Sequence, residues 1–338
     1  MRWEFIFNTS SHERTPFESC KGIKYGKSCA KKTVSRSHLP ILLSKVNGAS
    51  LAKLLYEYYG VSLSEKEKKW FALDGKELKG SILAGDNRGQ AVALAVSHED
   101  RSVCRMSFFN GTKESEVVAV RTMLKSPLVS QKITMDALHL KPNSLIPIAE
   151  AGGIFLVGLK DNQAELLAEM RFCSEQDQGI YAYDSGVKKG HGREERRSYC
   201  SYNIEKAYVD KRWKRANFNY LIKVQRERTI CNSHTHSKQI AYFLTNKKVQ
   251  NQADAMELYQ AIRCHWQVET ANNTRDCILR EDKLRCTITH TNQTIALCRT
   301  MVISILNKSD IKNRSEVMDY FADHFFKCIA FLKKIRFL

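Results

Sequence analysis

The stretch Trp-Phe-Ala-Leu-Asp-Gly at residues 70–75 places an acid at the end of an apolar run, directly before a turn residue. A second run, Lys-Ile-Thr-Met-Asp at residues 132–136, ends in the same way. Each run has the length and the bulky side chains of a buried strand. We therefore expect Asp74 and Asp136 where two strands end.

The segments around these two runs predict an α/β domain. Three strands come first, as an antiparallel meander, and helices then alternate with two further strands. This order is that of a ribonuclease-H-like fold, a mixed five-stranded sheet with flanking helices, in which the first and fourth strands are neighbours. The predicted strands are Trp70–Asp74, Ala91–Val96, Val103–Phe109, Lys132–Asp136 and Ile154–Leu159, and the predicted helices are Glu116–Leu124, Leu145–Ala151 and Ala164–Phe172.

The rest of the chain divides by pattern. The first 40 residues lack sustained apolar periodicity, which predicts a poorly ordered basic arm. Short alternating stretches with charged turns predict a mainly β insertion, and helical spacing returns at Ala253 and runs toward Leu279, before a last amphipathic helix, Thr294–Leu306. The predicted organisation is arm 1–40, first part of the core 41–178, insertion 179–250, C-terminal helices of the core 251–310 and tail 311–338.

Asp74 and Asp136 would lie side by side on neighbouring strands. Two carboxylates at short range repel each other unless a cation lies between them. Mg²⁺, or Mn²⁺, prefers such oxygen ligands, and two ions stabilise both oxygens of a phosphoryl displacement. Either aspartate alone reads as an ordinary turn residue; on matching strands, the two predict a metal centre.

A third acid is expected from the helix that follows the insertion. Glu269 lies near the apolar stripe of that helix, where an unpaired carboxylate is costly to bury, so it is the predicted helical ligand. Asp276 lies nearly two turns further on and shares its face, and we expect it to assist. Glu281 and Asp282 are rivals near the helix end.

The charge of the chain predicts its partner. Lys and Arg number 54 against 36 Asp and Glu, a net charge of +18, which attracts a polyanion. Nucleic acid is therefore expected, and a membrane is not, because no apolar run reaches the roughly 20 residues that span a bilayer. The 11 cysteines are scattered without a Cys-x-x-Cys pair, which favours reduced thiols. We expect a cytoplasmic protein.

Five motifs occur in order along the chain: Phe71–Ser81, Met135–His139, Leu159–Gln163, Gly190–Arg197 and His265–Glu269, the last followed by Arg275-Asp276 and Arg280–Asp282. They resemble the motifs of one family, the ISAs-type insertion-sequence transposases, which include the H-repeat-associated proteins. The similarity extends from Leu39 to Leu306, and Met1–Pro40 does not share it. The broader superfamily often has Tyr and Arg before its last acid, where this chain has Ile262 and His265.

The resemblance implies a DDE enzyme of a mobile element that cuts and joins double-stranded DNA at terminal inverted repeats. It implies the same catalytic acids, Asp74, Asp136 and Glu269, and a homo-oligomer assembled on DNA. Two alternatives remain open. The first is that the chain is an inactive or repurposed DNA-binding relic, which its altered N-terminal region would favour. The second is that it is a metal-dependent nuclease without strand transfer.

Basic and aromatic residues near the motifs are candidates for DNA contacts. A charge run is more often a solvated face, and the arginines of the fourth motif have Glu194 and Glu195 as alternative partners. Trp213, flanked by four cations, suits stacking on an unpaired base, or else covers the core of the insertion. The candidates are Lys76, Lys79, Lys160, His191, Arg193, Arg196, Arg197, Trp213 and Arg215.

Overall fold

The structure is a computed structural model that describes residues 35, 37–61, 63, 66–190, 192–309, 311 and 313–335. The predicted arm, residues 1–40, lies outside the described residues except for its last few. Within those, a short helix, α2 (His38–Ser44), has already begun. It is followed by α3 (Gly48–Tyr59), whose first turn is capped by the side chain of Asn47.

The predicted α/β class is confirmed, and β1 and β4 are neighbours as expected. One sheet has the strand order β3-β2-β1-β4-β5-β9-β8-β7-β6. The first five of these are the predicted strands, with β1, β4 and β5 parallel, β2 antiparallel to β1, and β3 antiparallel to β2. Their bounds are β1 (Trp70–Glu77), β2 (Ala91–Ser97), β3 (Val103–Phe109), β4 (Lys132–Met135) and β5 (Ile154–Leu159).

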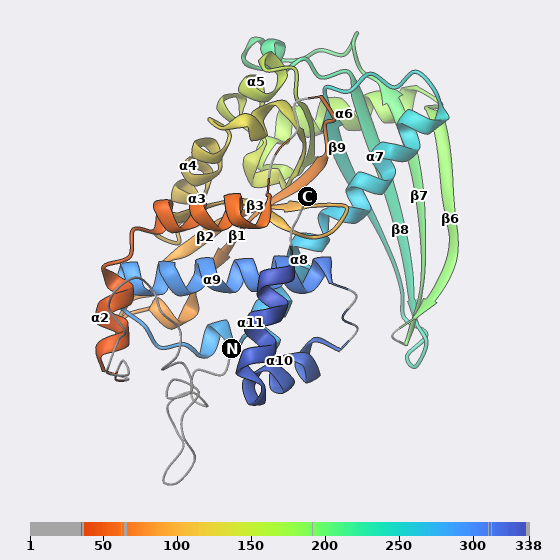
Figure 1. Ribbon diagram of the computed structural model, residues 1–338. Helices are drawn as coiled ribbons and strands as arrows, with labels where there is room; N and C mark the ends of the chain where they lie inside the picture. The colour runs from red at the N-terminus through yellow and green to blue at the C-terminus, as the bar shows by residue number, and fades with distance from the viewer. Residues whose placement is uncertain are drawn as a thin grey trace.

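The expected count of five strands is wrong, because the sheet has nine. The region predicted as a β insertion supplies four long strands, and β9 pairs antiparallel with β5, Leu156 opposite Thr245. This pairing satisfies the free backbone groups that an edge strand would expose. The four strands extend together beyond the helices (Figure 1). They are β6 (Ile180–Gly190), β7 (Arg193–Asn203), β8 (Tyr220–Ile230) and β9 (His236–Thr245).

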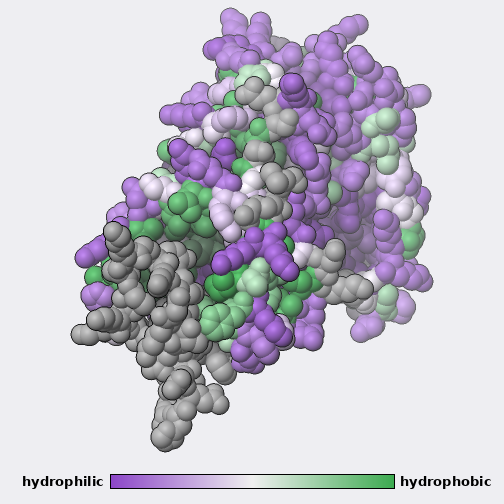
Figure 2. Space-filling model, in the orientation of Figure 1, coloured by the Kyte–Doolittle hydropathy of each residue, from purple (hydrophilic) through white to green (hydrophobic). Residues whose placement is uncertain are grey.

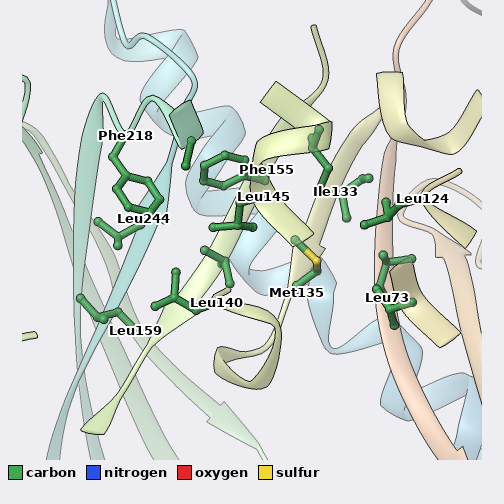
Figure 3. Packing of buried hydrophobic residues seen from close by; sticks show 14 of the residues in the cluster. Leu73, Leu124, Ile133, Met135, Leu140, Leu145, Phe155, Leu159, Phe218 and Leu244 are labelled. Carbon is green, nitrogen blue, oxygen red and sulfur yellow. The ribbon is translucent and has the colours of Figure 1, made fainter. Parts of the chain in front are cut away.

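Helices cover both faces of the sheet, as the alternation along β1 requires. Leu73 points into a core with residues of α4 (Lys113–Met123), α5 (Pro142–Glu150) and α6 (Ala164–Gln176), part of which Figure 3 shows. Ala72 points to the other face, against Val268 and Ala296. These belong to α8 (Gln267–Cys277) and α9 (Thr289–Lys308).

The single helix expected from Ala253 to Leu279 is two helices. One is α7 (Gln252–His265), the other is α8, and they meet at Trp266. The predicted tail also contains helices, α10 (Arg314–Asp323) and α11 (Phe325–Lys334). Residues of α11 pack with α3 and α9, so apolar contacts bring the two ends of the described chain together. None of the helices in the described part of the chain combines the length and the apolar composition that a bilayer crossing requires.

A buried ion pair fixes α8 in place. The guanidinium of Arg275, in α8, donates to both carboxylate oxygens of Glu281 at 2.7 and 2.8 Å, and to the hydroxyl of Thr300 in α9 at 2.6 Å. Arg275 is 1% exposed and Glu281 4%. Such a pair is costly to break, because one charge is then left buried without a partner.

We predict that Arg275→Met or Glu281→Gln lowers the free energy of unfolding by about 3–5 kcal/mol. The double variant Arg275→Met/Glu281→Met should be more stable than either single variant, since it leaves no unpaired charge. Urea unfolding of the three variants and the wild type measures this. Additive losses in the double variant would show that the two side chains do not act as a pair.

Candidate active site

Asp74 lies inside β1, three residues before its end at Glu77, so the expectation that it ends the strand is wrong. Its place is nevertheless special. The parallel ladder between β1 and β4 ends one residue earlier, at the pair Leu73 and Met135. Asp74 is therefore the first residue of β1 with no partner on the β4 side, where the sheet opens.

Asp136 follows the last residue of β4, as predicted. Its side chain caps the short 3-10 helix Ala137–His139 and accepts a hydrogen bond from the backbone N–H of Leu138 at 2.9 Å. The carboxylate is 48% exposed. The register of the two strands thus places Asp74 and Asp136 next to each other at the same edge of the ladder.

A cavity of about 470 Å³ joins the three predicted acids. It is lined by Asp74, Asp136 and Glu269 together with Lys160 and His265. Glu269 reaches it from the first turn of α8. Among the described residues, however, no three His, Cys, Asp or Glu side chains form a ready group for holding a metal. The acids share a cavity without forming a preassembled cluster.

The electrostatics of the cavity act most strongly on Asp74. Burial raises the pKa of its carboxyl group from 3.8 to about 7, and the charges of Glu116, Asp136 and Glu269 contribute to that rise, against a backbone hydrogen bond at Gly75 that lowers it. The side chain of Asn272 donates to Asp74 at 3.5 Å. The ionised form of Asp74 therefore lacks a compensating positive charge from the described residues.

Two histidines beside the cavity do not supply that compensation. The hydroxyl of Thr134 lies 2.9 Å from Nδ1 of His265 and 3.0 Å from Nε2 of His98. Burial is the main cause that lowers the pKa of His265 to about 4 and that of His98 to about 3. Both rings are neutral at pH 7, and His265 ties the end of α7 to β4.

Comparison of the sequence with known proteins identifies a family. A sequence profile described as the transposase DDE domain covers residues 66–305, well over half of the chain and all three acids. The chain belongs to the DDE transposase family.

Two relatives agree in part with this assignment. An Escherichia coli O157:H7 protein, provisionally named transposase YncI, is 22% identical over 287 residues, which are 80% of this chain and 70% of the relative. A protein of Xanthobacter autotrophicus, described only as uncharacterized and encoded in the dhlA 3′ region, is 30% identical over 138 residues. That second match spans 40% of this chain and 46% of the relative.

A second group of acids lies beyond Glu269, and basic residues of the chain neutralise it. Lys76, which is 8% exposed, forms ion pairs with Asp276 at 2.7 Å and with Asp282 at 3.4 Å. Lys79 pairs with Asp282 at 2.8 Å. Lys76 is thus buried between carboxylates, and the expectation that it holds a phosphate is wrong. Asp276 does not line the acid cavity, because seven residues of helix displace it by about 10 Å.

The rivals of Glu269 also have basic partners: Glu281 pairs with Arg275, and Asp282 with Lys76 and Lys79. By contrast, no Lys or Arg in the described part of the chain forms an ion pair with Asp74, Asp136 or Glu269. Divalent cations are the usual partners of this family's acids. Uncompensated carboxylates beside neutral histidines are a donor set that suits a hard cation.

Three predicted DNA-contact residues lie on β7 and have different surroundings. Arg193 and Arg197 line a hollow on one face of the strand, and Arg197 also pairs with Glu195 at 2.5 Å. Arg196 is not among the lining residues and pairs with Asp184 at 2.6 Å. This follows from the two-residue period of a strand. The three arginines therefore do not form one surface.

The other candidates are dispersed. Lys160 lines the acid cavity, and His191 lies outside the described residues. Trp213 is 1% exposed and packs on Phe218, so the alternative interpretation, that it covers a core, holds and base stacking is excluded. Arg215 pairs with Glu150 at the end of α5.

Sequence reasoning missed four residues near the site. Glu116 resembled an ordinary acid in the first turn of a helix, and His139 an ordinary member of a motif. Trp266 and Arg263 were expected within one continuous helix, yet they line a hollow next to the acids, and Trp266 is 51% exposed. The available signal was the tryptophan itself, three residues before Glu269 in the fifth motif.

We predict that Asp74→Asn stabilises the metal-free protein at pH 8 and not at pH 4. The folded protein holds this proton up to about pH 7, whereas the unfolded chain releases it near its ordinary value, so stability falls as pH rises between the two. The variant avoids this fall and should gain about 2–4 kcal/mol at pH 8. Thermal melts in EDTA at both pH values measure it, with exposed Asp86→Asn as the control. An equal gain at pH 4 would assign the effect to packing.

Proposed function

We propose that this transposase is of the ISAs type and performs metal-dependent cleavage and strand transfer at the terminal inverted repeats of an insertion sequence, with a ribonuclease-H-like core. One observation carries the proposal: Asp74 and Asp136 lie next to each other on adjacent parallel strands, in one cavity with Glu269. These are the three positions that the family resemblance selects. The protein would work as a homo-oligomer on DNA, at the bacterial nucleoid.

The three acids would hold two Mg²⁺ or Mn²⁺ ions. Such ions, when bound, stabilise the charge that develops on a phosphoryl group during in-line displacement. Asp74 is fixed by β1 and Asp136 by its cap on the following turn, while Glu269 is carried by α8, which the Arg275–Glu281 pair anchors. Lys160, on the cavity wall, is suited to contact a scissile phosphate as a point charge.

The DNA would reach the acids along a line of three hollows. The first, of about 360 Å³, lies between β6, β7 and α7; the second, of about 200 Å³, lies between β7–β9 and α7. Both are lined by Arg197, Tyr199 and Arg263. The second shares Ala241 and Phe243 with the acid cavity. The three hollows therefore adjoin one another, from the long strands to the cavity of Asp74.

The charge along this path suits a phosphate backbone. A single carboxylate, that of Glu195, lies among four guanidinium groups, which leaves a positive excess. Figure 2 shows that hydrophilic side chains dominate the surface over these strands. Trp266 adds an exposed ring at the second hollow, on which an unpaired base can stack. The four guanidinium groups, with the distance of each from a carboxylate oxygen of Glu195, are those of Arg197 (2.5 Å), Arg226 (3.1 Å), Arg228 (3.8 Å) and Arg263 (4.0 Å).

We predict that Asp74→Asn, Asp136→Asn and Glu269→Gln each reduce Mg²⁺- or Mn²⁺-dependent cleavage of DNA carrying the element ends by roughly 10³-fold or more, because several kcal/mol of transition-state stabilisation is lost. The substitutions preserve volume, so circular dichroism should be unchanged. Asp161→Asn, which removes an acid from the same cavity wall, is the matched control and should retain cleavage.

The wild-type protein separates the functional alternatives in the same assay. Cleavage followed by joining to a target plasmid is the expected result. Cleavage without joining would identify a nuclease, and specific binding of the ends without cleavage would identify a relic. Full cleavage by any one of the three acid variants would remove that acid from the catalytic set.

We predict that the double variant Arg193→Ala/Arg263→Ala flattens the dependence of DNA affinity on salt by up to about two units of log–log slope, since each duplex phosphate that a cation neutralises accounts for about 0.9. The control Arg196→Ala/Arg215→Ala removes the same charge away from the hollows, from residues paired with Asp184 and Glu150. It should keep the wild-type slope. Equal slopes for both double variants would refute the proposed path.

A further inference from the structure

A fourth acid lies against the proposed metal centre, and no part of the proposed mechanism uses it. Glu116 is in the first turn of α4 and its side chain is 19% exposed. Among the charged groups that raise the pKa of Asp74, Glu116 has the largest effect, ahead of Asp136 and Glu269. Helix α4 therefore contributes a charge to a site otherwise built from β1, β4 and α8.

The missing side chain of Gly75 makes room for this acid. A Cβ at position 75 would lie 2.6 Å from Cδ of Glu116 and 2.8 and 2.9 Å from its carboxylate oxygens. Real Cβ atoms do not approach other atoms so closely. Glu116 thus rests directly on the backbone of β1, one residue beyond Asp74. Gly75 does not have a positive φ, so a side chain here would conflict with the carboxylate of Glu116 and not with a turn.

A buried histidine lies between the fourth acid, Glu116, and one of the three predicted acids, Asp136. Nε2 of His139 lies 3.3 Å from Glu116 and 3.9 Å from Asp136, and its side chain is 1% exposed. Neither ring nitrogen makes a hydrogen bond among the described residues. The imidazole therefore lies between the two carboxylates and adjoins both.

We propose that Glu116 is a positioning residue of the cation centre: seated on Gly75 and linked through His139 to Asp136, it raises the affinity for divalent cations by its negative charge. The proposal rests on the proposed function, because it needs Asp74 and Asp136 to hold the cations. A purely structural role for Glu116 would be to fill the space over Gly75 and beside His139. The two roles differ in whether charge or volume matters.

The first experiment measures Mn²⁺ binding by the full-length protein, from the electron paramagnetic resonance signal of free Mn²⁺. Glu116→Gln keeps the volume and removes the charge, and it should weaken Mn²⁺ binding by at least about threefold. Glu116→Asp keeps the charge and should bind more tightly than Glu116→Gln. Glu114→Gln, an exposed acid in the same helical turn, is the matched control and should bind as the wild type does.

The second experiment tests the seat on Gly75 by a double-variant cycle. Gly75→Ala should lower the melting temperature and weaken Mn²⁺ binding, because the new methyl group displaces the carboxylate of Glu116. Adding Glu116→Ala frees the space, so the double variant should recover melting temperature relative to Gly75→Ala. Its Mn²⁺ affinity should stay low, since the charge is absent.

The outcomes separate this proposal from the one on which it rests. If Glu116→Gln binds Mn²⁺ as tightly as the wild type while Asp136→Asn does not, Glu116 has a structural role and the metal centre stands. If Asp74→Asn and Asp136→Asn also bind as the wild type does, the metal centre itself is refuted. No recovery of melting temperature in the Gly75/Glu116 double variant would refute the contact.

Discussion

The parallel pairing of β1 with β4 is the constraint on which the site depends. It ends at Leu73 and Met135, so the next residue of each strand, Asp74 and Asp136, meets its neighbour where the ladder opens. A shift of one residue would turn every side chain of β1 to the opposite face, which would bury Asp74 in the core that holds Leu73. The same apolar alternation that secures the core therefore fixes the distance between two acids. The geometry of the proposed site and the folding of the core thus have one cause.

The four added strands make the site part of a longer surface. Because β9 pairs with β5, the long strands continue the same sheet, and α7 lies against both parts. The hollows between α7 and these strands then lead into the acid cavity without a domain boundary. If the insertion were a separate β subdomain, as the sequence suggested, the path of a DNA strand to the acids would depend on the angle of a hinge. In a continuous sheet, the position of Glu195, on β7, relative to Asp74, on β1, is set by the backbone hydrogen bonds between the strands.

The sequence predicted the class, the first five strands and the neighbouring aspartates, because those depend on local apolar runs and on the rules of strand order. It did not predict the nine-stranded sheet, since the pairing of β9 with β5 joins residues almost 90 positions apart, such as Leu156 and Thr245. The sequence also did not show which of the candidate DNA-contact residues are buried. Lys76 and Trp213 differ little in sequence context from residues on the surface, and only packing shows that both are buried. Glu116 was missed because it packs where a side chain of Gly75 would lie, and a sequence pattern does not show such a contact.

The charges around α8 differ between its two ends: the acids near its end are paired within the protein, and the acid at its start belongs to the proposed site. Toward its end, each acid has a cation from the chain: Asp276 has Lys76, Glu281 has Arg275, and Asp282 has Lys79. At its start, Glu269 faces Asp74 and Asp136 with no such partner among the described residues. Burial and repulsion raise the pKa of Asp74 to about 7, so the ionised form of Asp74 costs free energy in the metal-free fold. A cation removes that cost on binding, and the folded state then gains stability that grows with the ion's affinity. The acids that the described part of the chain leaves without a basic partner are thus the three that we propose as metal ligands.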